Sequence, residues 1–248
     1  MEISKNEQKL IEQIKEKFYM PPLIKGLDEF IKSGGTWKLA FDKIYEILVN
    51  GKSAVDEILL NRQSEGNIKN MDQARKSIAG NAFSNLIIYV FLQNKINGLI
   101  NENVFITNKK SDIKDFNSIA TINVDGETQK PDVDLIIYSK NEDGSTKKCA
   151  ILSLKTSLRE RAGQTYKWKL LMEIANYSEQ IKSKYNITYN PTCMPLVCFA
   201  TVNFYNEINN PQNRGMFKFF DKSFIGKEVD SDFICKLSTI VDFVNGDF

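Results

Sequence analysis

The stretch that decides the fold runs from Pro131 to Arg161 and reads PDVDLIIYSKNEDGSTKKCAILSLKTSLRER. It contains two apolar runs, VDLIIY and CAILSLK, separated by a polar segment around Asp143-Gly144. Because Asp-Gly between two apolar runs is typical of a hairpin turn, the stretch predicts two antiparallel strands. Both runs are almost continuously apolar, which indicates strands that are covered on both faces.

Helical patterns precede this hairpin. Apolar residues recur at helical spacing over residues 4–63, where three helices are expected. The second helix ends at the glycine pair 34–35, and the third begins at Thr36, a possible N-cap, and ends at Gly51. A longer core helix is expected over residues 72–97, because its apolar side chains form a broad stripe.

Strands and helices alternate after residue 100. Short strands are expected within residues 101–130, followed by the hairpin and by a helix over residues 164–184. The runs PLVCFATVNFYN and MFKFFDKSFIG predict two more strands, and residues 232–244 predict a short helix broken at Gly246. This order of elements predicts an α/β protein with a core of few strands.

Composition limits the classes of function. The chain has 248 residues, of which 42% are hydrophobic and 26% charged, and this is ordinary for a globular protein. It has no histidine, which excludes Ser-His-Asp and Cys-His catalysis and histidine-ligated zinc. A metal site must therefore use oxygen ligands, which favours Mg²⁺ or Mn²⁺. The four cysteines form no CxxC pair and the first residues are polar, so we expect reduced thiols in a cytoplasmic protein without a membrane span.

The charge is unevenly distributed along the chain. The net charge is only +2, but the segment from Lys147 to Lys169 carries seven basic residues and a single acid, Glu160. A local basic stripe on a near-neutral protein suits a DNA-binding cleft. A solvated face is the alternative interpretation.

The hairpin predicts a cluster of charged side chains. Side chains two apart on a strand face the same way, so Asp132 shares a face with Asp134. If the turn centres near residues 143–144, Asp134 lies opposite Ser153, with Cβ atoms within about 5.5 Å. Asp132 then lies opposite Lys155. A divalent metal held by one or both aspartates would lie beside the lysine ammonium, as phosphodiester hydrolysis requires. The alternatives are that Asp132 caps the preceding turn, or that Lys155 only pairs with an aspartate.

The pair Pro131-Asp132, followed by SLK at residues 153–155, resembles the PD-(D/E)xK nuclease signature. The resemblance implies a restriction-endonuclease-like α/β fold, in which a central mixed β-sheet is flanked by helices and carries the signature on a strand hairpin. Residues 1–70 would then form an N-terminal helical region packed on the core. Residues 71–248 would form the catalytic and DNA-recognition domain.

The middle acid of (D/E)xK is replaced by Ser153. This resembles the CCGG-type branch of type II restriction endonucleases, in which Ser-x-Lys occurs and the following helix supplies the missing glutamate. The resemblance implies Asp132 and Asp134 as metal ligands, with Glu173 as the helix acid. Glu173 lies about one helical turn later than the branch pattern places it, so Gln164 or a water is the alternative ligand.

Arg159-Glu160-Arg161 follows the lysine and resembles the Arg-(Glu/Asp)-Arg reader of the same branch. Arginine can donate two parallel bonds to guanine O6 and N7, and glutamate can accept a bond from cytosine N4. The tripeptide is therefore expected to read adjacent G·C pairs in the major groove. The alternative is an exposed salt bridge at a helix start. Lys167, from the basic run, is also expected to contact DNA.

Two further segments are candidates for DNA contact. The segment from Arg75 to Phe83 resembles the helix that precedes the core in many restriction enzymes, but Ser84 stands where a glutamate often follows. The number of metal ions therefore stays open, and Arg75 either contacts a phosphate or lies on a solvated face. An amide-rich segment that ends in Asn213 and Arg214 predicts either a second recognition loop or an ordinary surface loop.

These features predict a type II restriction endonuclease that hydrolyses double-stranded DNA at a short, palindromic, G·C-containing site with Mg²⁺, or Mn²⁺ in its place. Asp132 and Asp134 would hold the metal, which activates water and polarises the phosphate, while Lys155 orients or deprotonates the water and stabilises the transition state. A palindromic site implies a homodimer, and a DNA methyltransferase gene is expected nearby. The alternatives are a PD-(D/E)xK nuclease without sequence specificity and a non-catalytic DNA-binding protein.

Overall fold

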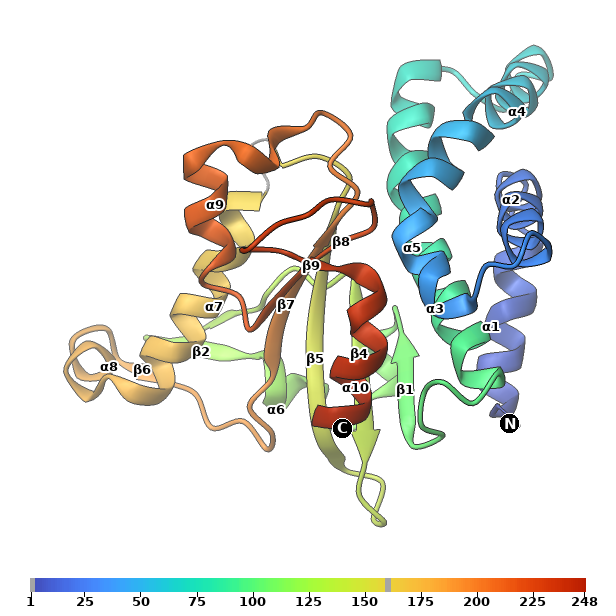
Figure 1. Cartoon of the computed structure of the whole chain (residues 1–248). Helices are drawn as coiled ribbons and strands as arrows, with labels where there is room; N and C mark the ends of the chain where they lie inside the picture. The colour runs from blue at the N-terminus through green and yellow to red at the C-terminus, as the bar shows by residue number, and fades with distance from the viewer. Residues whose placement is uncertain (1–2, 159–161) are drawn as a thin grey trace. The chain divides into compact units, whose positions relative to one another are not determined.

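A computed structural model describes residues 3–158 and 162–248 (Figure 1). The chain divides into two compact units. Unit 1 comprises Met1–Glu102, Ile225–Asp230 and Lys236–Asn245, and unit 2 comprises Asn103–Phe224, Ser231–Cys235 and Gly246–Phe248. Within the described ranges, no helix combines the length and apolar character needed to cross a membrane. The expected boundary of the functional domains at residue 70 stays a prediction.

Unit 1 is helical. Its helices are α1 (Lys5–Lys15), α2 (Met20–Lys32), α3 (Trp37–Ala40), α4 (Ile44–Ser64), α5 (Met71–Ile96) and most of α10 (Ile240–Asp247), with 3₁₀ turns at Phe41–Lys43 and Leu237–Thr239. Thr36 caps α3 as predicted, since its Oγ1 accepts a bond from the Leu39 N–H at 3.3 Å. The predicted core helix over residues 72–97 is α5.

Gly51 does not end a helix, contrary to the prediction. α4 continues through it to Ser64. A Cβ atom at Gly51 would lie 2.4 Å from a methyl carbon of Leu23 on α2, so the glycine permits close packing of two helices. Val55 and Leu59 remain buried beyond it and stabilise the continued helix.

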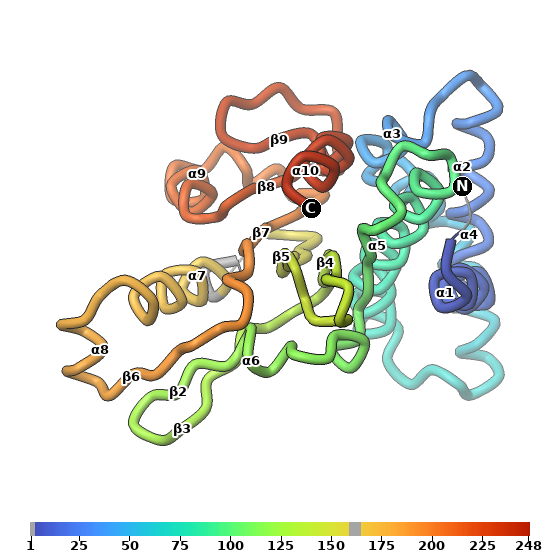
Figure 2. The backbone as a smooth tube through the Cα atoms, turned by 90° about the horizontal axis from the view of Figure 1, so that it is seen from below, coloured from blue at the N-terminus to red at the C-terminus, as the bar shows by residue number. Residues whose placement is uncertain are grey.

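Unit 2 is built on a six-stranded sheet with the order β1-β4-β5-β7-β8-β9. These strands are β1 (Val104–Thr107), β4 (Leu135–Lys140), β5 (Thr146–Lys155), β7 (Leu196–Thr201), β8 (Lys222–Ile225) and β9 (Cys235–Lys236). A smaller sheet, β3-β2-β6, is seen in Figure 2 and consists of β2 (Ile122–Val124), β3 (Glu127–Gln129) and β6 (Ile187–Thr188). The helices of unit 2 are α6 (Phe116–Ala120), α7 (Ala162–Tyr177), α8 (Glu179–Tyr185) and α9 (Pro211–Phe217), with 3₁₀ turns at Lys110–Asp112 and Glu207–Asn209.

The central sheet is mixed, as predicted. β1 pairs antiparallel with β4, β4 pairs antiparallel with β5, and β5 pairs parallel with β7. The predicted hairpin is therefore confirmed, with Leu135 opposite Leu152 and its apolar residues buried. α7 follows β5 and packs along the sheet, because Thr165 contacts Ser153 on β5. This is the restriction-endonuclease-like α/β arrangement, with an N-terminal helical part.

Three predicted elements have other bounds in the structure. The helix over residues 164–184 is divided at Ser178 into α7 and α8. The strand expected in MFKFFDKSFIG is only β8, because its first residues complete α9, which begins with an Asn210 cap and Pro211. The final helix begins at Ile240 instead of residue 232, and it includes Gly246.

Candidate active site

Asp134 lies immediately before β4 and gathers three donors on one carboxylate oxygen. Its Oδ2 accepts hydrogen bonds from the Leu154 N–H at 2.7 Å, from Lys155 Nζ at 2.9 Å and from Ser153 Oγ at 3.5 Å. The strand register explains this arrangement, because Leu135 pairs with Leu152 and the next residues outward are Asp134 and Ser153. The predicted meeting of an aspartate with the lysine is present in the structure.

Lys155 and Asp132 complete the cluster. The Lys155 side chain ends β5 and is only 14% exposed, whereas the Asp132 side chain is 81% exposed. Asp132 Oδ2 lies 3.9 Å from Lys155 Nζ, so both aspartates face the same ammonium. A lysine with so little exposure to solvent needs a countercharge, and here an oxygen of each aspartate lies within 4 Å of it.

Thr165, which the sequence did not single out, also belongs to this cluster. Its Oγ1 lies 3.2 Å from Ser153 Oγ, and both residues are buried. Thr165 lies in the first turns of α7, so the helix that follows β5 places a hydroxyl behind the aspartate. The sequence offered one indication of this contact. The connection between Lys155 and the helix is short, so the first turn of α7 must lie near the end of β5.

The oxygen donors of the cluster fit a hard divalent cation. The hydrogen bonds to Asp134 described above all use Oδ2, and Asp132 offers a second, exposed carboxylate. Among residues 3–158 and 162–248, however, no three acidic or cysteine side chains lie close enough to hold one ion together. Mg²⁺ is commonly bound by one or two carboxylates and completed by water, so two aspartates are a sufficient protein contribution.

Glu173 lies elsewhere on α7. Its Oε1 is 3.2 Å from Lys169 Nζ, which also donates to Asp221 at 2.8 Å. Asp221 in turn accepts a bond from the Val197 N–H near the start of β7. Thr165, which contacts the cluster, is two helical turns earlier than Glu173, or about 12 Å along the helix axis. The structure therefore does not bring Glu173 to Asp132 and Asp134, and its role as a ligand stays a prediction.

Lys169 is held by the acids around it. Burial alone would lower the pKa of this lysine, but the hydrogen bonds and charges of Asp221 and Glu173 outweigh burial and raise the pKa. Trp168 and Lys169 are the residues at the place where the resemblance predicts the acid. In this chain the position therefore carries a buried cation that joins α7 to the residue before β8.

The other predicted DNA-contacting residues are dispersed. Lys167 is exposed on α7. Arg75 forms an ion pair with Asp56 at 2.9 Å, and Arg214 lies 3.8 Å from an oxygen of Asp232. Asn213 donates from Nδ2 to the backbone carbonyl of Glu207 at 2.8 Å, within α9 and not in a loop. Arg159, Glu160 and Arg161 lie outside the described residues, as does the side chain of Gln164.

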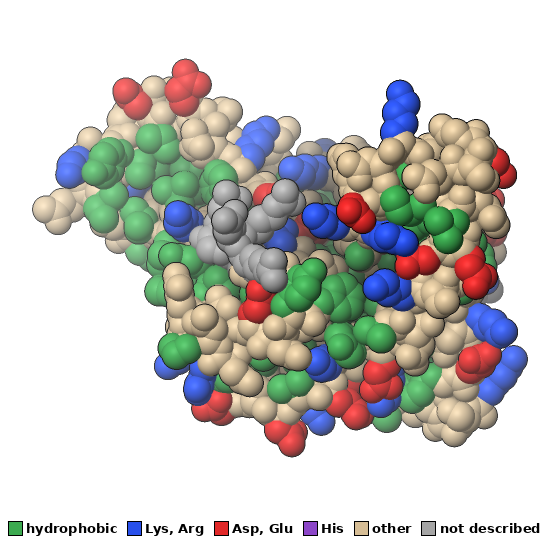
Figure 3. All heavy atoms as spheres, turned by 90° about the horizontal axis from the view of Figure 1, so that it is seen from above, with side chains coloured by type: hydrophobic (Ala, Val, Ile, Leu, Met, Phe, Trp, Pro, Cys, Tyr) green, Lys and Arg blue, Asp and Glu red, His purple; other side chains and the backbone are tan. Residues whose placement is uncertain are grey.

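The described lysines of the basic run do not form one stripe, contrary to one interpretation of the sequence, and Arg159 and Arg161 of that run lie outside the described residues. Lys147 and Lys148 lie near the start of β5 and Lys155 at its end, so roughly 25 Å separates them at the usual rise of a strand. Figure 3 shows basic and acidic side chains interspersed on the face seen from above. Charge alone therefore does not mark a DNA-binding cleft on this face.

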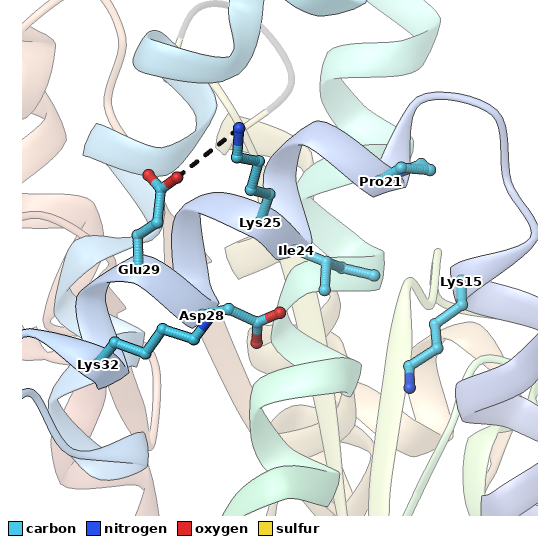
Figure 4. A pocket seen from close by; sticks show the side chains of 7 residues that line it. All are labelled: Lys15, Pro21, Ile24, Lys25, Asp28, Glu29 and Lys32. Carbon is cyan, nitrogen blue, oxygen red and sulfur yellow. Dashed lines mark ion pairs between the residues drawn. The ribbon is translucent and has the colours of Figure 1, made fainter.

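Unit 1 has a hollow of about 440 Å³ between α1 and α2 (Figure 4). Its lining residues carry both signs of charge and are Lys15, Pro21, Ile24, Lys25, Asp28, Glu29 and Lys32. Lys25 lies 3.9 Å from Glu29, so part of this charge is neutralised within the hollow. None of the predicted site residues lines it.

The fold and the cluster together define a protein of the restriction-endonuclease-like α/β class, with two aspartates and a lysine at the end of a strand hairpin. Residues 109–244, more than half of the chain, match the family described as BsaWI restriction endonuclease type 2. The chain belongs to this family, and it is therefore a type II restriction endonuclease, a hydrolase that cleaves DNA at specific sites. No curated protein matches the chain.

Proposed function

We propose that Asp132, Asp134 and Lys155 form the catalytic centre of this restriction endonuclease and act on double-stranded DNA with Mg²⁺. The observation that carries the proposal is the single ammonium that lies 2.9 Å from one aspartate and 3.9 Å from the other. Apolar strand residues surround this group, and charges at such a place need compensation or a function.

The two aspartates would hold the cation, with Asp134 fixed in orientation and Asp132 free to adjust at the surface. When bound, Mg²⁺ supplies Lewis-acid stabilisation of charge at the scissile phosphate, and Mn²⁺ is expected to replace it. We favour water or Gln164 over Glu173 as the further ligand, because Glu173 pairs with Lys169.

Lys155 would act on the phosphate and on the attacking water. Its ammonium is held in place by Asp134 Oδ2, so little reorganisation is needed when negative charge develops on the phosphate oxygens. As an ammonium the same Nζ can donate to the attacking water and orient it once DNA is bound, and it could take the proton of that water only after giving up one of its own. Ser153 supports the arrangement by donating to the carboxylate, and Thr165 contacts the Ser153 hydroxyl.

Sequence readout would come from Arg159, Glu160 and Arg161. They follow the catalytic strand directly, and their donor and acceptor pattern fits adjacent G·C pairs in the major groove. We therefore propose a short, palindromic, G·C-containing site and a cognate DNA methyltransferase encoded next to this gene. Lys167 and Arg75 would add contacts to phosphates.

Digestion of plasmid DNA with and without Mg²⁺, followed by sequencing of the ends, tests the proposal. Discrete fragments with one shared end sequence are expected with Mg²⁺ and none with a chelator. A smear would instead indicate a nuclease without sequence specificity. Discrete cleavage that survives complete removal of divalent ions would contradict the metal-dependent centre.

A further inference from the structure

The loop that follows β7 lies at the end of the central sheet where Lys155 is found. Because β5 and β7 run parallel with Lys155 beside Thr201, both strands end on the same side of the sheet. The Phe204 N–H donates to the Thr156 carbonyl at 3.0 Å, so the loop is joined to the residue directly after this lysine. Tyr205 is the next residue of the loop. The chain therefore holds Tyr205 close to the proposed catalytic centre.

Hydrogen bonds within the loop hold it in a compact conformation. The Asn203 N–H donates to Thr201 Oγ1 at 2.9 Å, and Asn203 Oδ1 accepts from the Glu207 N–H at 2.8 Å. The Asn206 N–H also donates to the Asn203 carbonyl at 3.2 Å. These bonds close residues 203–207 into a turn that contains Tyr205.

The same turn has two features that are unfavourable for stability. Asn203 and Asn206 adopt left-handed backbone conformations, with φ of 49° and 53°. Such conformations are uncommon for residues other than glycine, although asparagine tolerates them better than most. Among the residues that the structure describes, the buried Nδ2 of Asn203 has no hydrogen-bond partner. Strained backbone and unsatisfied buried donors occur preferentially at functional sites, so stability alone does not explain this turn.

The turn presents an aromatic ring to solvent. Tyr205 is 60% exposed, whereas tyrosine rings are usually more buried against their neighbours. A single exposed aromatic residue would need no explanation elsewhere on the surface. Here it lies on a strained and hydrogen-bonded turn beside the proposed catalytic centre, where the bound DNA has to lie.

We infer that Tyr205 is a DNA-binding residue whose ring packs against the sugar–phosphate backbone near the scissile phosphate. The inference rests on the proposed catalytic centre at Asp132, Asp134 and Lys155. A duplex keeps its bases stacked inside, so a ring at this place meets deoxyribose and phosphate first. Contacts to the backbone position the duplex and carry no sequence preference. Removal of the ring from water favours the complex.

The test compares Tyr205→Ala and Tyr205→Phe with a matched control, Tyr185→Ala, in the full-length enzyme. Tyr185 lies on α8, is 51% exposed and has no proposed role. Dissociation constants are measured in a chelator, so that the DNA stays intact, for a duplex with the cleavage site and for a duplex of unrelated sequence. Tyr205→Ala is expected to weaken binding of both by about fivefold or more, because the contact area of the ring is lost. Tyr205→Phe keeps the ring, so this variant and the control should stay within about twofold of the wild type.

The other outcomes overturn the inference. Wild-type affinity in Tyr205→Ala, or an equal loss in Tyr185→Ala, would show that the ring makes no particular contact. If Tyr205→Phe is impaired as much as Tyr205→Ala, the hydroxyl and not the ring makes the contact. A loss confined to the duplex with the cleavage site would indicate base readout instead. Should Tyr205→Ala not fold, Tyr205→Gln removes the ring but keeps a polar side chain, and wild-type affinity in that variant would overturn the inference.

Lys155→Met separates failure of this inference from failure of the proposed centre. If Lys155→Met cleaves DNA like the wild type, the proposed centre fails, and the inference fails with it. If Lys155→Met loses cleavage while Tyr205→Ala binds both duplexes like the wild type, only the inference is overturned.

Discussion

Asp134 shows how one carboxylate oxygen can organise a site. A backbone amide, an ammonium and a hydroxyl all converge on Oδ2, from three consecutive residues of β5. The backbone bond does not depend on any side chain, so the aspartate keeps its orientation when a neighbour is substituted. Substitutions in this cluster should therefore affect the reaction more than the fold.

The first prediction concerns Lys155→Met. It removes the ammonium but leaves Asp134 bonded to the Leu154 amide, so the protein should fold and bind its site. Cleavage should fall by at least about 100-fold, as expected for loss of a group that stabilises transition-state charge. Single-turnover cleavage and equilibrium binding to the same duplex measure the two effects. Lys52→Met, at an exposed lysine of α4 with no proposed role, is the matched control, and cleavage by Lys155→Met at the control's rate would refute the assignment.

The second prediction concerns Thr165→Val, a change of nearly equal volume. It removes the hydroxyl that lies 3.2 Å from Ser153 Oγ, so the Ser153 hydroxyl is less well oriented toward Asp134. We expect kcat to fall about 3- to 10-fold, which corresponds to one ordinary hydrogen bond. Thr165→Ser keeps the hydroxyl and should restore the rate. If the valine and serine variants are equally impaired, packing and not the hydroxyl is responsible.

At the scale of elements, the sequence determined the hairpin more fully than the rest of unit 2. Two apolar runs around Asp143-Gly144 predict the hairpin, and a slip of one residue would turn each side chain of β4 to the opposite face of the sheet and change its packing partners. The start of α9 was misassigned because the apolar run after Met216 is typical of a strand, while the cap at Asn210 and Pro211 begins a helix before it.

The positions of Glu173 and of the basic run show why the rest of the site could not be predicted from the sequence. The distance of Glu173 from the aspartates depends on which turn of α7 meets β5, and that is decided by the contact of Thr165 with Ser153. The prediction of a basic stripe differs from the structure for a similar reason, because Lys147 and Lys155 lie at opposite ends of a ten-residue strand. Local patterns identify elements, but tertiary packing decides which of their residues meet.

The third prediction concerns the buried ion pair that joins α1 to α5. Lys95 Nζ lies 2.7 Å from Glu7 Oε1, and the two side chains are 1% and 5% exposed. Lys95→Met leaves the Glu7 carboxylate buried without this partner and should lower the free energy of unfolding by about 3 kcal/mol. The double variant Glu7→Gln/Lys95→Met removes both charges, keeps the capping function at Ser4 and should recover most of the loss. Urea denaturation measures the free energy of unfolding of both variants. An equal loss of stability in the two would contradict the prediction.

The fourth prediction concerns the pH dependence of the contact between α6 and β5. Burial alone would raise the pKa of Asp115, but hydrogen bonds from Thr146 and Thr192 outweigh burial and lower it. A folded-state pKa below the unfolded value, near 4, gives stability that is present above that value and is lost as the pH falls through the folded-state pKa. Asp115→Asn should therefore cost about 1 kcal/mol at pH 7 and less near pH 3. Melting temperatures of both proteins between these pH values test this, and a difference that grows in acid would contradict it.

For the whole molecule, a near-neutral charge implies that DNA binding depends on local contacts. The net charge is +2, and both acidic and basic side chains are present on the face shown in Figure 3. A protein without a large positive field gains little from long-range attraction, so its binding to DNA should depend on contacts at short range. Under the proposed function, Arg159, Glu160 and Arg161 would supply such contacts.

The fifth prediction concerns assembly. The described residues contain one cluster of aspartates with a lysine per chain, yet cleavage of both strands of a palindromic site needs two centres related by a two-fold axis. We therefore expect a homodimer on cognate DNA, with a protein mass about twice the 28.4 kDa of one chain by light scattering. Mixed dimers of wild-type and Lys155→Met chains should nick plasmid DNA in one strand, whereas wild-type dimers linearise it. A monomer that stays monomeric on DNA and still linearises plasmid in a single binding event would exclude this assembly, because one centre would then have to cut two strands of opposite polarity in turn.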